Sequence, residues 1–176
     1  MIKPLIYQKK ALEWYENNGK KGLIAKTFSN MGVTLQFQGK IIEALEVYQK
    51  ALEVSENNKF TKSTILSLIN LAEVYVLLRD FEIAKSNILK AIRLSRIIKD
   101  SNLVSSSYTQ LGDYYFGVNK IDSAKLYYNY SLKINKYKLA TLSKLRLKLV
   151  TIYISENNLV KAEDMLISAI EDSKKS

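Results

Sequence analysis

The apolar and polar positions of this chain alternate with the period of an α-helix along most of its length. Leu68, Leu71, Tyr75 and Leu78 follow one another at spacings of three or four residues, which places them on one face of a helix. The same spacing recurs at Ile121, Ala124, Tyr128 and Leu132. Short polar segments separate such stretches. The pattern therefore predicts an all-α chain of helices joined by turns.

The helical pattern repeats at an offset of 40 residues. One small-residue position is filled in successive units by Gly32, Ala72 and Gly112. A second is filled by Ala44, Ala84 and Ala124. A fourth unit follows after a step of 38 residues, with Tyr153, Ala162, Leu166 and Ala169 in the corresponding places. Because one helical hairpin cannot bury its own apolar face, such units are expected to stack on one another.

The repeat divides the chain into units of two helices each. We predict a partial repeat at residues 1–20 that holds only a second helix, and full repeats at residues 21–60, 61–100, 101–138 and 139–176. Together they form one continuous solenoid domain.

Particular residues mark the turns and the helix crossings. Gly39, Asn119 and Asn157 suit the left-handed backbone that ends a helix. Gly32 and Gly112 are expected where the two helices of a hairpin cross so closely that a larger side chain would hold them apart.

These positions resemble the tetratricopeptide repeat family, whose pattern is a large residue, Leu-Gly, Tyr, Ala, an aromatic residue and Ala. The best-matched unit carries Tyr108, Leu111, Gly112, Tyr115, Ala124, Tyr128 and Ser131. The units exceed the roughly 34 residues of the standard repeat, and look like the longer units of bacterial regulatory proteins. The resemblance implies an all-α, right-handed α-α superhelix of antiparallel helical hairpins. It also implies a non-catalytic scaffold that binds a protein or peptide, such as the sensing or docking region of a larger regulator.

The resemblance further implies that the first helices of successive hairpins line a concave groove. Amides there can bond an extended peptide backbone, and apolar residues can receive its side chains. The candidate peptide-binding residues, taken by register from the four units, are Asn30, Val33, Phe37, Asn70, Glu73, Leu77, Gln110, Asp113, Phe116, Lys144 and Lys148. Chaperone-binding members clamp a terminal carboxylate with lysines, an arginine and asparagines in this groove. Placed on the first three units, that pattern fits only at Asn70. Moved by one unit, it gains Lys144 and Lys148 but puts Glu73 where a carboxylate would be repelled, so we do not expect that ligand.

The chain carries a net charge of +10. Residues 1–88 hold 12 basic and 9 acidic side chains, and residues 89–176 hold 15 and 8. The excess is explained by solubility and by a lysine-rich composition, but an acidic partner is an alternative. The basic run from Lys133 to Lys148, with nearby tyrosines, raises a further alternative of nucleic-acid binding. The varying positions show no regular set of base-reading side chains, so nucleic acid is not the expected partner.

Composition also narrows the chemistry. The chain has no cysteine and no histidine, which removes thiol nucleophiles and the commonest general base and metal ligand. No glycine-rich phosphate loop or metal-ligand cluster is evident. We therefore expect no enzyme activity, no cofactor and no metal. No apolar run reaches the roughly 20 residues of a membrane span, and the N-terminus lacks a signal-peptide pattern, so a cytoplasmic location is expected.

The two ends of the chain suggest one more interaction. Tyr7 to Asn17 match Val47 to Asn57, so the chain begins on the second helix of a unit. At the other end no polar helix closes the stack, and Ile167 and Ile170 either face solvent or are covered. We expect a fragment of a larger protein. The alternative is self-association, as a homodimer, through the terminal helices.

Overall fold

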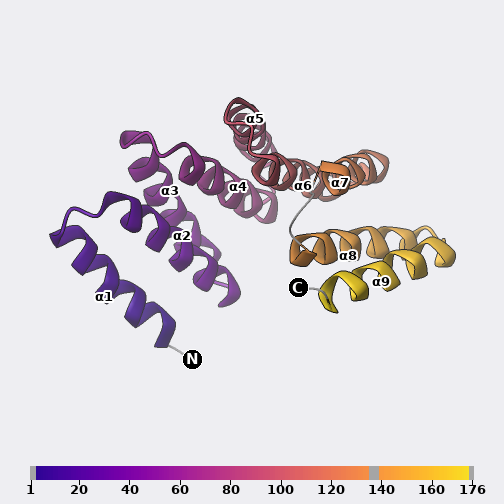
Figure 1. Cartoon of the computed structure of the whole chain (residues 1–176), viewed down its shortest axis with the longest axis horizontal. Helices are drawn as coiled ribbons and strands as arrows, with labels where there is room; N and C mark the ends of the chain where they lie inside the picture. The colour runs from indigo at the N-terminus through magenta and orange to yellow at the C-terminus, as the bar shows by residue number, and fades with distance from the viewer. Residues whose placement is uncertain (1–2, 135–138, 175–176) are drawn as a thin grey trace. The chain divides into compact units, whose positions relative to one another are not determined.

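The computed structural model describes residues 3–134 and 139–174 of the chain, and the secondary structure within them is entirely α-helical (Figure 1). The helices in chain order are α1 (Lys3–Asn17), α2 (Lys21–Phe37), α3 (Ile41–Asn57), α4 (Thr61–Leu77), α5 (Phe81–Ile97), α6 (Ser101–Gly117), α7 (Ile121–Ile134), α8 (Leu139–Ser155) and α9 (Leu159–Lys174).

The helices keep a regular spacing along the chain. Helices α2 to α7 begin at residues 21, 41, 61, 81, 101 and 121, and each of α2 to α6 is 17 residues long. The 40-residue period of the sequence therefore corresponds to two equal helices and two three-residue turns.

The middle residue of these three-residue turns has a left-handed backbone. Gly39, Asn119 and Asn157 have φ values of 73°, 59° and 56°, which confirms the prediction made for them. Turns that lack glycine close with a common backbone hydrogen bond. Phe60 donates its backbone N–H to the carbonyl of Ser55 at 2.8 Å. This bond over five residues satisfies a carbonyl that the end of a helix leaves open.

The sequence did not single out three other left-handed residues. Lys59, Arg79 and Lys99 have φ values of 57°, 62° and 53°. Long side chains adopt this backbone at a cost of roughly 1–2 kcal/mol each. The spacing of the helices, and not a glycine, therefore fixes where these turns fall.

The chain divides into two compact units, Met1–Leu94 and Ser95–Ser176, which are described separately. In the first unit α2 packs against α1, α3 and α4, and α3 also packs against α4. In the second unit α6 pairs with α7 and α8 pairs with α9, while α7 packs against α8. Hairpins thus form between consecutive helices in both units, as the repeat predicts.

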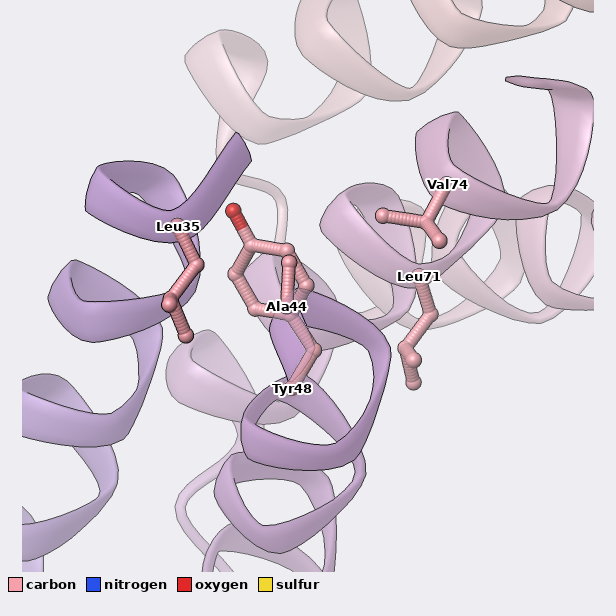
Figure 2. Close-up of a cluster of buried hydrophobic side chains, with 5 residues drawn as sticks. All are labelled: Leu35, Ala44, Tyr48, Leu71 and Val74. Carbon is pink, nitrogen blue, oxygen red and sulfur yellow. The ribbon is translucent and has the colours of Figure 1, made fainter. Parts of the chain in front are cut away.

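Tyr48 forms the centre of the core in the first unit. Figure 2 shows its ring between Leu35 on one side and Leu71 and Val74 on the other. The ring is completely buried, and its hydroxyl donates to Oε1 of Gln36 at 2.5 Å. This single side chain joins α2, α3 and α4.

Gly32 makes room for this ring. A Cβ atom placed on Gly32 would lie 2.3 Å from Cε1 of Tyr48, far inside the roughly 3.5–4.0 Å of a normal carbon contact. In the second unit the Cβ of a residue at Gly112 would lie 2.4 Å from the ring of Tyr128. The expected close crossing at both glycines is confirmed, and its cause is the aromatic ring of the facing helix.

Candidate functional site

A groove lies between α2 and α4 in the first unit. Its cavity volume is about 320 Å³. Three of the residues predicted from the repeat, Asn30, Val33 and Asn70, line it together. The residues that complete its lining are Gly22, Lys26, Ser29, Ser63 and Leu66. Residues 40 positions apart in the sequence are thus brought to one surface.

The groove combines hydrogen-bonding groups with apolar surface. The side-chain amides of Asn30 and Asn70 can both donate and accept hydrogen bonds. Val33 and Leu66 each leave an apolar side chain exposed. Lys26 supplies the single charge, since the eight lining residues include no carboxylate. This combination is suited to a polar backbone that carries apolar or acidic side chains.

The other predicted residues of the first unit do not line this cavity. Phe37, at the end of α2, is 90% exposed, and Leu77, at the end of α4, is also exposed. Glu73 lies on the exposed side of α4. Burial, and secondly the negative charge of Glu73, raise the pKa of the Tyr48 hydroxyl above its ordinary value of 10. Glu73 is therefore electrostatically linked to the core tyrosine.

In the second unit, Asp113, Phe116 and Lys148 come together in a smaller cavity of about 120 Å³, with Tyr128 and Thr151. One carboxylate oxygen of Asp113 accepts hydrogen bonds from the Tyr128 hydroxyl and from Nζ of Lys148, both at 2.6 Å. Burial, and secondly the charge of Asp113, raise the pKa of Tyr128. The charged atoms of this cavity are thus already engaged with one another.

The last two predicted residues differ in accessibility. Gln110 on α6 is buried, and its Nε2 finds no hydrogen-bond partner among the described residues. Lys144 on α8 is exposed. Register alone did not reveal that Gln110 would be covered, because burial at that position depends on the neighbouring helices.

Several basic residues of the C-terminal half are paired with acids. Arg146 lies 3.2 Å from the carboxylate of Asp172. Lys125 lies 2.5 Å from Glu156 and 3.1 Å from Asp122. These carboxylates reduce the charge available for phosphates, a feature that the clustering of lysines in the sequence did not show. Lys136 and Lys138, which belong to the predicted basic run, lie outside the described residues.

The described part of the chain holds neither a membrane-spanning helix nor a cluster of metal ligands. None of its helices is both long enough and apolar enough to cross a lipid bilayer. No three acidic side chains within residues 3–134 and 139–174 are grouped so that they could hold a metal ion.

Comparison with known proteins gives two kinds of match. Tetratricopeptide repeat models match residues 24–57 in one case, and residues 66–97 and 105–138 in another. These segments together exceed half of the 176 residues. No curated protein matches the chain in sequence.

Several solved structures share the fold. BtubC from P. vanneervenii is 23% identical, with a TM-score of 0.67 over 88% of this chain and 65% of that chain. The apo form of RapI is 19% identical, with a TM-score of 0.73 over 96% and 60%. A Rap protein in complex with competence and sporulation factor is 14% identical, with a TM-score of 0.77 over 96% and 50%.

The chain spans less than two thirds of the length of each of these three proteins. At this level of identity the likeness concerns the fold, and it confirms the predicted class of all-α repeat solenoid. The repeat matches, the paired helices and the glycine–tyrosine crossings lead to one conclusion: the chain belongs to the tetratricopeptide repeat family.

Proposed function

We propose that the groove between α2 and α4 binds an extended peptide segment of a partner protein. One observation carries the proposal: Asn30, Val33 and Asn70, chosen by register, line a single cavity. The same cavity has hydroxyl groups and a lysine at its wall, which add polar contacts to those of the two amides.

Each part of the groove has a role in this proposal. The amides of Asn30 and Asn70 hold the peptide backbone, because an extended strand presents unpaired N–H and C=O groups along its length. Val33 and Leu66 contact an apolar side chain of the peptide. Lys26 favours a segment with an acidic residue, since no carboxylate lines the groove to compete for the lysine.

The cavity of the second unit is a weaker candidate. It is smaller, at about 120 Å³, and Asp113 already accepts hydrogen bonds from Tyr128 and Lys148. A ligand would have to break these bonds before it could use the same atoms. In the first unit the two asparagine amides face a cavity of about 320 Å³.

Selection of peptides from a displayed random library on the full chain tests the proposal. The affinity of selected peptides is then measured by fluorescence anisotropy for the double variant Asn30→Ala/Asn70→Ala. If each amide contributes about 1 kcal/mol, the double variant binds about 30-fold more weakly.

Asn129→Ala is the matched control, because it makes the same chemical change on α7, where the Asn129 amide is exposed. It is expected to leave the affinity unchanged. Equal affinity of the double variant and the control for a selected peptide would remove the assignment of the groove.

We propose that the chain is non-catalytic and cytoplasmic and forms a sensing or docking region of a larger regulator. The docking role is supported by the likeness in fold to a Rap protein solved in complex with competence and sporulation factor. Exposed apolar residues on α9, among them Val160, Ile167 and Ile170, support pairing of two copies through that helix. The repeat boundaries at residues 20, 60, 100 and 138 remain part of this proposal.

A further inference from the structure

A second, larger cavity lies in the first unit, between α1 and the hairpin of α2 and α3. Its volume is about 430 Å³. It shares no lining residue with the groove between α2 and α4. Most of its wall is apolar, formed by Leu5, Ile6, Leu12, Phe28, Met31, Leu35 and Val47. Its polar lining residues are Lys9, Lys40, Glu43, Glu46 and Lys50.

The hairpin of α6 and α7 has large rings at the corresponding positions. Helices α6 and α7 begin 80 residues after α2 and α3. At this offset, Phe28, Leu35, Val47 and Lys50 correspond to Tyr108, Tyr115, Tyr127 and Tyr130. Four tyrosines thus occupy the helix face that in the first hairpin borders the cavity.

These rings pack against one another. The ring of Tyr127 is stacked on Tyr115, with centroids 5.2 Å apart and an angle of 9°, and on Tyr108 at 6.0 Å and 14°. Tyr130 meets Tyr108 edge-on at 4.6 Å. The face of this hairpin is therefore filled with aromatic rings. The first hairpin has the smaller side chains of Leu35 and Val47 at the positions of Tyr115 and Tyr127, and both residues border the cavity.

The size and lining of the cavity suit a small molecule. A volume of about 430 Å³ lies within the roughly 300–1,000 Å³ of ligand pockets, which are mostly apolar with a few polar groups. Since flat rings fill the equivalent face of the other hairpin, an aromatic ring is the shape best matched to the walls.

The charges at the cavity favour an anion. Nζ of Lys40 is paired with the carboxylate of Glu43 at 2.9 Å. Lys9 and Lys50 are exposed, and neither forms an ion pair within the part of the chain that the structure describes. Glu46 is the remaining acid of the lining. Two lysines thus face one carboxylate, which leaves one net positive charge for a ligand.

We propose that this cavity binds a small amphipathic anion, with an aromatic body against the apolar wall and a negatively charged group beside Lys9 and Lys50. The site is independent of the peptide groove, so either proposal can fail without the other.

Binding of two fluorescent dyes to the full chain tests the proposal. Anilinonaphthalene sulfonate has an aromatic body and one negative charge, and phenylnaphthylamine is its uncharged analogue. We expect the anionic dye to bind at one saturable site per chain and more tightly than the neutral dye.

The variant Val47→Tyr introduces the residue found at Tyr127 of the other hairpin and fills the cavity. It should weaken binding of both dyes at least about tenfold, which is the loss expected when a ring occupies the space of the ligand. Val33→Tyr adds the same ring in the groove between α2 and α4 and should leave dye binding unchanged.

The variant Lys9→Gln/Lys50→Gln changes only exposed side chains and so keeps the test decisive if Val47→Tyr does not fold. It should weaken the anionic dye about fivefold, the effect of losing two exposed charge contacts, and leave the neutral dye unchanged. Absence of saturable binding would overturn the proposal. Unchanged affinity of the anionic dye for the lysine variant would also overturn it, whatever the result for Val47→Tyr.

Discussion

Substitution of Gly32 by alanine tests how the first hairpin is held together. The added Cβ would lie 2.3, 2.5 and 2.6 Å from three atoms of the Tyr48 ring. The ring cannot move easily, because it is fully buried between α2 and α4 and its hydroxyl is bonded to Gln36. Relief of the contact therefore requires the two helices of the hairpin to separate.

The magnitude follows from two opposing effects. Overpacking of a well-filled core costs about 1–3 kcal/mol, and contacts this short place the substitution near 3 kcal/mol. Alanine is better than glycine inside a helix by about 1 kcal/mol. The free energy of unfolding should thus fall by about 2 kcal/mol, which lowers the melting temperature by about 4–8 °C for a chain of this size.

Urea unfolding followed by far-UV circular dichroism measures the effect. Gly22→Ala is the matched control in the same helix, because its Cβ would meet only the Phe60 ring, at 3.8 Å, so its stability should be unchanged or slightly higher. The double variant Gly32→Ala/Tyr48→Ile recreates the buried pair Ala72 and Ile88 of the next unit and should be less destabilised than the sum of the single variants. A Gly32→Ala chain as stable as the original, or strictly additive losses, would refute the steric explanation.

Two further predictions concern pH and association. Burial raises the pKa of Tyr48 and Tyr128 above 10 in the folded chain, so the unfolded state loses these protons first as the pH rises. The stability that these two protonated tyrosines contribute is complete below pH ~10 and is lost above it. The midpoint of urea unfolding should therefore fall between pH 9 and pH 11, and it should fall less in Tyr128→Phe. An equal fall of the midpoint in the variant and the original chain would contradict this. If α9 pairs two copies, sedimentation velocity should show a concentration-dependent dimer that Val160→Lys/Ile167→Lys abolishes; a monomer at all concentrations would exclude this pairing.

The sequence was sufficient to predict the helices and the contacts within each hairpin. The apolar spacing and the 40-residue offset depend only on local geometry, which is why helices begin at 40-residue intervals, at residues 21, 61 and 101. The small residues at Gly32 and Gly112 were correctly placed at helix crossings. Asn30, Val33 and Asn70 line one cavity, because register fixes which helix face they occupy.

Features that depend on several helices were not accessible from the sequence. Burial of Gln110 and the bonds that tie Asp113 to Tyr128 and Lys148 arise only when neighbouring helices pack. The cavity bordered by Val47 was also missed. Comparison of Val47 with Tyr127 at the same repeat position was the signal that could have revealed it, since a loss of side-chain volume at a packed face leaves space unless the backbone moves.

The left-handed turn residues Lys59, Arg79 and Lys99 link the backbone to the charge of the protein. Each holds a cation near the negative end of a helix dipole, where it contributes about 0.3–1 kcal/mol and partly offsets the conformational cost of the turn. Glycine at the three positions would relax the backbone but lower the net charge from +10 to +7. Positive charge and a relaxed backbone are therefore alternatives at the same three residues. The long-range electric field of this scaffold can be adjusted at its turns without a substitution in any helix.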